Sequence, residues 1–89
     1  MINVIGLGYI GLPTALMFAK SGIEVIGTDL SDRLVDSLSK GKLTFEETGL
    51  EDLFSAAVES GIKFTTEYQE TDTYIVAVPT PYINSSKKL

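Results

Sequence analysis

Three glycines near the start of the chain have a spacing that suits the binding of a diphosphate. Gly6, Gly8 and Gly11 form a G-x-G-x-x-G pattern between an apolar run, Met1 to Ile5, and a helix-like run, Leu12 to Ser21. In this context the glycines permit a tight turn, let the backbone approach a pyrophosphate, and let the helix pack closely on the strand. The phosphates would rest on the helix N-terminus, where unpaired N–H groups and the helix dipole favour negative charge. The pattern therefore predicts dinucleotide binding.

Two residues inside the pattern would contribute through their backbone. Tyr9 and Ile10 would present N–H groups to the pyrophosphate, so their side chains matter less there. An ordinary tight turn between a strand and a helix is the alternative interpretation of the glycines.

An acidic residue follows the glycines at the distance expected for a ribose ligand. Asp29 comes 18 residues after Gly11, close to the offset of about 20 residues typical of the carboxylate that holds the adenosine ribose. An ionised Asp only accepts hydrogen bonds, so it suits two ribose hydroxyls and repels a 2′-phosphate, which favours NAD over NADP. The alternative is a helix cap, a role for which Ser31 competes. Arg33 would stack on adenine, pair with a 2′-phosphate, or simply be a solvated helix residue.

A proline-flanked threonine follows the last apolar run. Val78, Pro79 and Thr80 come at the end of a predicted strand that would lie beside the glycine turn at the switch point of the sheet. The nicotinamide or its ribose would pass here, and the Thr80 hydroxyl would donate or accept a hydrogen bond. The alternative is that Pro79-Thr80-Pro81 only terminates the strand.

An acidic cluster near the middle of the chain is interpreted as a solvated helix start, because acidic groups suit a helix N-terminus and no His or Cys accompanies them. Its members are Glu46, Glu47, Glu51 and Asp52. We expect no metal site there.

The composition excludes several classes of function. The chain has 89 residues and a net charge of −5, whereas nucleic-acid binding demands basic patches. It contains no cysteine, which rules out disulfides and thiolate metal sites and agrees with a cytoplasmic location. It contains no histidine, the commonest metal ligand and general base. No apolar run reaches the ~20 residues of a membrane span, and the N-terminus shows no signal-peptide pattern, so we expect neither nucleic acid nor membrane as a partner.

Short apolar runs alternate with helical patterns. The predicted strands cover residues 2–5, 23–28, 62–65 and 74–78, and the predicted helices cover 11–21, 32–40 and a stretch near 50–58. The third helix has an apolar stripe formed by Leu50, Leu53, Phe54, Ala57 and Val58. Its start is predicted as a capping box, with Thr48 as the cap and Glu51 reaching back to it. A single helical turn is predicted from Thr66 to Gln69.

This alternation predicts an α/β fold. The sheet should be parallel, and right-handed crossovers give the spatial strand order 3-2-1-4 of a Rossmann-like, three-layer αβα architecture. Only one βαβαβ half plus one strand is present, so we expect a fragment of a larger protein. Residues 1–81 would form the cofactor-binding unit and residues 82–89 a loose tail. The strand over 74–78 would be an uncharged edge that pairs with another chain, which predicts a homo-oligomer.

These residues together resemble the start of the nucleotide-sugar 6-dehydrogenases, a family that includes UDP-glucose dehydrogenase and UDP-N-acetylmannosamine dehydrogenase. The matches follow the family's order and spacing over most of the chain. They are Gly6-Leu-Gly-Tyr-Ile-Gly-Leu-Pro-Thr14, Asp29, Val35-Asp36-x-Leu38-x-x-Gly41, Glu47-x-Gly49-Leu50, Thr65-Thr66 and Val76-Ala-Val-Pro-Thr-Pro81. The run Val78-Pro-Thr-Pro81 is more similar to the N-acetylhexosamine branch than to the glucose branch.

The resemblance implies a two-step, NAD-dependent oxidation of the C6 alcohol of a UDP-sugar to a carboxylate. By similarity, the glycine turn binds the pyrophosphate, Asp29 the adenosine ribose, Arg33 flanks the adenine, and Thr80 approaches the nicotinamide. The family's catalytic cysteine, lysine, asparagine and aspartate belong to later segments, as does most of the sugar site. We therefore expect the 89 residues by themselves to have no dehydrogenase activity. A non-catalytic module that binds NAD or ADP-ribose, and a purely structural piece, are the alternative interpretations.

Overall fold

Strands and helices alternate along the chain as the sequence predicts. The computed structural model describes residues 1–77. Val78, Pro79, Thr80 and the predicted tail 82–89 lie outside the described residues. The elements are β1 (Ile2–Ile5), α1 (Gly11–Lys20), β2 (Val25–Thr28), α2 (Asp32–Ser39), α3 (Leu50–Glu59), β3 (Lys63–Thr65) and β4 (Thr73–Val76).

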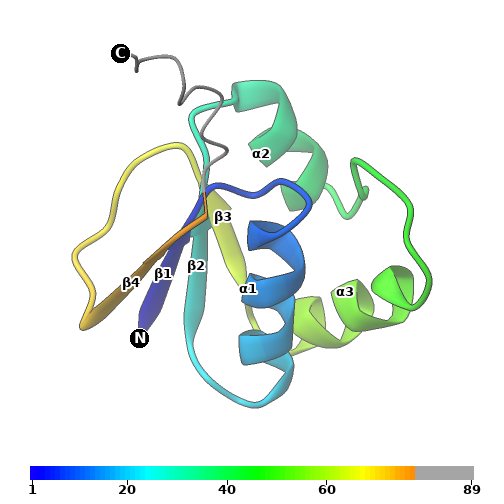
Figure 1. Cartoon of the computed structure of the whole chain (residues 1–89), viewed down its shortest axis with the longest axis horizontal. Helices are drawn as coiled ribbons and strands as arrows, with labels where there is room; N and C mark the ends of the chain where they lie inside the picture. The colour runs from blue at the N-terminus through cyan, green and yellow to red at the C-terminus, as the bar shows by residue number, and fades with distance from the viewer. Residues whose placement is uncertain (78–89) are drawn as a thin grey trace, which may run out of the picture.

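The four strands form one parallel sheet with the order β3-β2-β1-β4, which confirms the predicted topology (Figure 1). Strand β1 lies at the centre, where Ile5 is paired with Thr28 of β2 and with Val76 of β4. The carboxyl ends of β1, β2 and β3 therefore meet at one edge of the sheet. In open α/β sheets this edge carries the ligand site.

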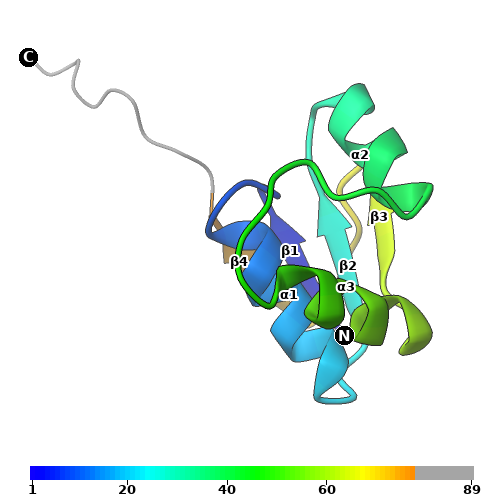
Figure 2. The same cartoon turned by 90° about the vertical axis from the view of Figure 1, so that its right-hand side faces the viewer.

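The described helices cover one face of the sheet. Helices α1 and α3 pack together against it, and α2 lies on the same side beside β3 (Figures 1 and 2). This placement follows from right-handed crossovers that run from β1 to β2 and on to β3 in one direction. The opposite face meets the connection 66–72, which carries no helix. The described residues thus supply two layers of the predicted three.

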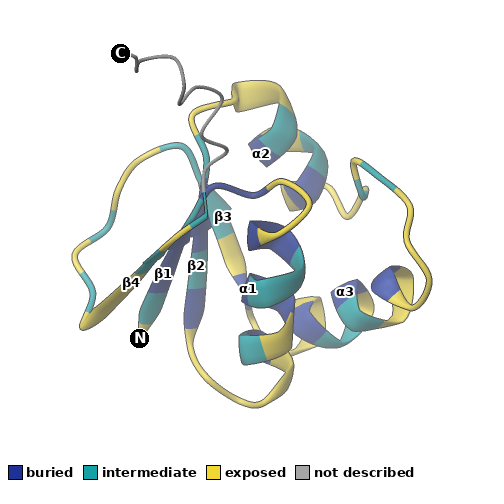
Figure 3. Cartoon of the chain, viewed as in Figure 1, coloured by how far each residue is buried: buried dark blue, intermediate teal, exposed yellow. Residues whose placement is uncertain are grey.

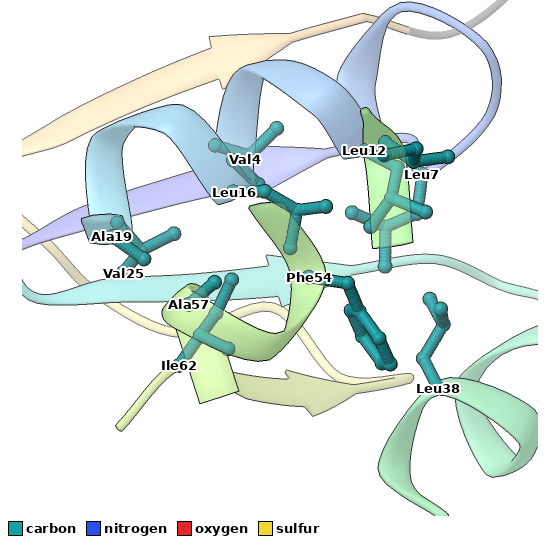
Figure 4. Packing of buried hydrophobic residues seen from close by; sticks show 12 residues of the cluster. Val4, Leu7, Leu12, Leu16, Ala19, Val25, Leu38, Phe54, Ala57 and Ile62 are labelled. Carbon is teal, nitrogen blue, oxygen red and sulfur yellow. The ribbon is translucent and has the colours of Figure 1, made fainter. Parts of the chain in front are cut away.

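The core lies between the sheet and the helices α1 and α3 (Figures 3 and 4). Val4 of β1 and Leu16 of α1 are fully buried, and Phe54 and Ala57 bring α3 onto them. Burial of each large apolar side chain contributes about 1.5–3 kcal/mol, so this interface stabilises the position of α1 on the sheet.

The three helices within residues 1–77 end in the same backbone motif. At the end of α1, the Gly22 N–H donates to the Ala19 carbonyl and the Ile23 N–H to the Phe18 carbonyl, at 3.0 and 3.1 Å. Gly22 has φ +94°, the left-handed conformation that this Schellman motif requires. The predicted start of the second strand at residue 23 is therefore wrong, because Ile23 completes the helix end and β2 begins at Val25. The motif recurs with Gly41 after α2 and Gly61 after α3.

The predicted capping box at the start of α3 is also wrong. Helix α3 begins at Leu50, and its N-cap is Gly49 in the left-handed conformation with φ +82° and no side-chain bond. A turn in which the Leu50 N–H donates to the Glu47 carbonyl at 3.0 Å precedes the helix. Thr48 thus lies one residue too early to act as the cap. Glycine tolerates a φ that would strain a threonine there.

The apolar stripe of α3 is narrower than predicted. Leu50, Phe54 and Ala57 are buried and Leu53 is partly buried, whereas Val58 is 49% exposed. At about 100° per residue, Val58 lies about 80° around the helix from Leu50, at the border of the face that meets the sheet.

The predicted helical turn from Thr66 to Gln69 does not form. Instead, the Asn3 side-chain amide donates to the Gln69 carbonyl at 3.2 Å, and the Thr65 hydroxyl accepts from the Glu67 N–H at 3.1 Å. These bonds hold the connection between β3 and β4 in a non-helical path across the sheet (Figure 1).

Candidate functional site

The three motif glycines meet different demands within the chain. Gly6 has φ +97°, a conformation that other residues adopt only with strain. At Gly11 a Cβ atom would overlap the Gly6 carbonyl and lie 3.2 Å from the Ala77 Cβ, so the helix meets the turn too closely for a side chain. Both glycines are explained by the turn and by packing.

Gly8 has no such internal explanation. Its φ lies outside the left-handed region, and a Cβ atom there would meet no heavy atom within 4 Å among the described residues. The backbone at Gly8 faces open space. A glycine that neither the turn nor the packing requires is typical of a place where a ligand approaches the backbone closely. This observation favours a binding site over an ordinary turn.

The N-terminus of α1 offers unpaired donors next to Gly8. The first turn contains no acidic side chain, and Ile10 at the N-cap position makes no side-chain cap. Within residues 1–77, the N–H groups of Tyr9, Ile10 and Gly11 donate to no protein acceptor. Their donors and the helix dipole together suit an anion.

Asp29 faces the glycine turn. Its Oδ2 accepts the Leu7 N–H at 2.9 Å and its Oδ1 accepts the Ser31 N–H at 3.0 Å. A carboxylate has about four acceptor positions, so two protein donors leave capacity for ligand hydroxyls. Helix α2 is capped by Ser31, whose hydroxyl accepts the Leu34 N–H at 3.2 Å. The competing role of Asp29 as helix cap is therefore filled by Ser31.

A hollow of about 310 Å³ joins the glycine turn to Asp29. Gly6 and Gly8 line it at one end, and Asp29 is its one charged residue. Leu30, Leu34 and Tyr68 supply apolar and aromatic walls. The hollow thus combines a glycine turn next to unpaired N–H donors, a hydrogen-bond acceptor and an apolar compartment.

The other predicted site residues have different surroundings. Arg33 is exposed and lines a separate shallow hollow with Thr66, so the structure does not bring it to the hollow of Asp29. The Tyr9 ring packs on Phe45 from the connection between α2 and α3, with centroids 4.6 Å apart. The roles of Arg33 and Thr80 stay predictions, since Thr80 lies outside residues 1–77.

Three walls of the hollow were not predicted as site residues. Leu30 follows Asp29 directly, Leu34 lies in the first turn of α2, and Tyr68 comes from the connection after β3. The Asp29 N–H donates to the Thr65 carbonyl at 3.1 Å, which brings the end of β3 beside the acid. The predicted strand order already implied that residues after the third strand lie near Asp29, because it places the ends of the second and third strands side by side.

The described residues offer neither a metal site nor a membrane span. No group of three or more acidic side chains in residues 1–77 is arranged to hold a metal ion. None of the helices in this part of the chain is long and apolar enough to cross a bilayer.

Several proteins similar in sequence to this chain are named as nucleotide-sugar dehydrogenases. The UDP-N-acetyl-D-mannosamine dehydrogenase of Campylobacter jejuni is 51% identical over 82 residues, which are 91% of this chain and 20% of that protein. The NDP-N-acetyl-D-galactosaminuronic acid dehydrogenase of Ralstonia nicotianae is 42% identical over 87 residues, 97% of this chain and 21% of that protein. The chain thus spans about a fifth of the length of these relatives.

Solved structures agree in fold. The UDP-N-acetyl-mannosamine dehydrogenase of Staphylococcus aureus superposes with a TM-score of 0.84 at 43% identity, over 88% of this chain and 19% of that one. The GDP-mannose dehydrogenase of Pseudomonas aeruginosa, in a ternary complex, gives 0.83 at 34% identity, over 90% and 20%. Residues 1–88 match the NAD binding domain of the UDP-glucose/GDP-mannose dehydrogenase family. The chain therefore belongs to this family, as its NAD-binding domain.

Proposed function

We propose that this chain is the cofactor-binding part of a nucleotide-sugar 6-dehydrogenase and holds NAD between the glycine turn and Asp29. The parent enzyme would oxidise the C6 alcohol of a UDP-sugar to a carboxylate. This conversion removes four electrons and consumes one water molecule, so it needs two molecules of NAD, each of which accepts one hydride. The relatives' names, which refer to UDP-N-acetylmannosamine and GDP-mannose, support this class of substrate.

The open backbone at Gly8 is the observation that carries the proposal. It lies beside the unpaired N–H groups of Tyr9, Ile10 and Gly11, where a diphosphate would find both space and donors. Asp29 would accept hydroxyl groups of the adenosine ribose with the acceptor positions that Leu7 and Ser31 leave free. Its negative charge would repel a 2′-phosphate, which supports NAD rather than NADP.

The chemical step would fall to residues of the parent protein outside these 89. The sequence contains no cysteine to act as a nucleophile and no histidine to act as a base. We therefore expect the chain alone to bind NAD without oxidising a UDP-sugar. These 89 residues contain no cysteine and so form no disulfide, which supports a cytoplasmic location.

The proposal includes a homo-oligomeric assembly. Strand β4 forms one border of the sheet within residues 1–77, and Tyr74 and Val76 on it are exposed. A border strand of this kind offers unpaired backbone groups to a second chain.

Cofactor preference tests the proposal. We would measure the affinities of the chain for NAD and NADP in the wild type, in Asp29→Asn and in the matched control Asp32→Asn. Asp32 is an exposed acid in the first turn of α2. The wild type and the control should bind NAD more tightly than NADP. Asp29→Asn should weaken NAD binding about tenfold, because the side chain loses one acceptor oxygen and its negative charge. The ratio of the affinities for NAD and NADP should become smaller for the same reason.

The outcomes separate the alternatives. No binding of NAD by the wild type would leave only a structural role for the glycine turn. An unchanged preference in Asp29→Asn would remove this acid from the site. Binding of NAD by a longer gene product that forms no NADH from any UDP-sugar would favour a non-catalytic NAD or ADP-ribose module.

A further inference from the structure

The part of the hollow lined by Leu30, Leu34 and Tyr68 has the chemistry of a base-binding site. Leu30 and Tyr68 are exposed to it, Leu34 is half-buried, and no Lys or Arg lines it. With Asp29 as its one charged residue, this compartment suits a neutral, flat group better than a second phosphate. We infer that Tyr68 is the wall on which the adenine ring packs, an inference that rests on the proposed function.

The backbone on both sides of Tyr68 is anchored although its own ring is free to meet a ligand. Before it, the Glu67 N–H donates to the Thr65 hydroxyl at 3.1 Å. After it, the Gln69 carbonyl accepts the side-chain amide of Asn3 at 3.2 Å. Within residues 1–77, the Tyr68 hydroxyl makes no hydrogen bond with the protein. The fold thus fixes the backbone on both sides of Tyr68 and leaves its ring available to a ligand.

Asn3 links this wall to the centre of the sheet. Its side chain is fully buried in β1, and its Oδ1 accepts the Thr28 hydroxyl at 2.8 Å, so both ends of the amide are used. Thr28 directly precedes Asp29. The buried Asn3 side chain therefore bonds both to β2, which leads to Asp29, and to the connection that carries Tyr68. Asn3 is a positioning residue for Tyr68.

Asp29 and Tyr68 both line the hollow, and a hydrogen bond joins the segments that carry them. The Asp29 N–H donates to the Thr65 carbonyl at 3.1 Å, and Tyr68 follows Thr65 by three residues. A nucleoside whose ribose hydroxyls meet Asp29 would bring its base within the same hollow of about 310 Å³. Aromatic side chains are the usual partners of bases because every base has a π-face.

The test compares ADP with ribose 5-diphosphate, which lacks the base but keeps the ribose and diphosphate. In the wild type, ADP should bind at least tenfold more tightly. Tyr68→Ala should reduce this advantage about tenfold, within the range of a base–aromatic contact, and leave the affinity for ribose 5-diphosphate unchanged. Tyr68→Phe keeps the ring and should behave as wild type. Met17→Ala is the matched control, since Met17 and Tyr68 are each 61% exposed and Met17 lines a different hollow.

A double-variant cycle tests the positioning role of Asn3. Asn3→Leu removes the donor to the Gln69 carbonyl and should reduce the ADP advantage, whereas in a Tyr68→Ala background it should produce no further reduction. If Asn3→Leu reduces the ADP advantage by the same factor in the Tyr68→Ala background as in the wild type, Asn3 does not act through Tyr68.

Two results would overturn the inference without touching the proposed function. One is a wild type that binds ADP no more tightly than ribose 5-diphosphate. The other is a Tyr68→Ala variant that keeps the full ADP advantage. A wild type that binds neither ligand and no NAD would instead overturn the proposed function itself.

Discussion

Replacement of Gly8 by alanine separates binding from folding. A Cβ atom at this position meets no heavy atom within 4 Å, and the residue is not in the left-handed region. The substitution should change the free energy of unfolding by no more than about 1 kcal/mol, with a small gain expected from the lower entropy of the unfolded chain. The added methyl group would stand where the diphosphate approaches the backbone. We expect the affinity for NAD to fall at least tenfold, or about 1.4 kcal/mol.

Gly41 provides the opposite control. It follows α2 with φ +85° and lies outside the hollow, so Gly41→Ala should destabilise the fold by about 1–2 kcal/mol through backbone strain. Its affinity for NAD, measured where the protein is folded, should equal that of the wild type. Urea denaturation gives the stability of each variant and isothermal titration its affinity. A Gly8→Ala variant that binds NAD as well as the wild type would refute the account of the open backbone.

Three further predictions concern the fold and its assembly. Leu16→Ala, in the fully buried centre of the core, should lower the free energy of unfolding in urea by about 2–5 kcal/mol, and a loss below 1 kcal/mol would contradict the packing of α1 on the sheet. Thr28→Val should cost about 1–3 kcal/mol in the same assay because Asn3 Oδ1 loses its buried donor, whereas an unchanged stability would show that this bond contributes nothing. The chain should self-associate through β4 in analytical ultracentrifugation, and a pure monomer at high concentration would argue against pairing at that border.

The sheet and the direction of Asp29 were predictable from sequence because they follow from periodicity and crossover handedness. Short β-branched runs separated by helical stripes leave few parallel topologies, and the order 3-2-1-4 is among the commonest. That order brings the end of β2 beside the turn after β1. Asp29, at this end, then has to face Gly6 and its neighbours, as the bond from the Leu7 N–H shows.

The boundaries of helices and strands were less predictable, because a residue type that favours one local structure also occurs in another. Ile23 and Ile62 are β-branched and precede strands, yet each donates its N–H into the preceding helix end after a glycine. Thr48 and Glu51 have the spacing of a capping box, but the positive φ of Gly49 makes glycine the cap instead. In each case the glycine conformation decided the outcome.

The walls of the hollow depend on tertiary contacts that a sequence pattern does not carry. Tyr68 reaches the site because Asn3, within the sheet, donates to the carbonyl of Gln69, which lies 66 residues later in the sequence. Arg33 shows the converse: it lies four residues after Asp29, but helix α2 carries it into another hollow. Distance in sequence from Asp29 therefore does not by itself indicate which residues line its hollow, and the predicted place of Arg33 beside the adenine stays a prediction.

A titration with NAD followed by ¹H–¹⁵N NMR observes, residue by residue, whether the turn before α1 holds the diphosphate. Addition of NAD should shift the amide signals of Gly8, Tyr9, Ile10 and Gly11 first and most strongly, with Asp29 and its neighbours moving along the same binding curve. Signals of the turn that stay in place at saturating NAD, or shifts confined to another part of the chain, would contradict the account.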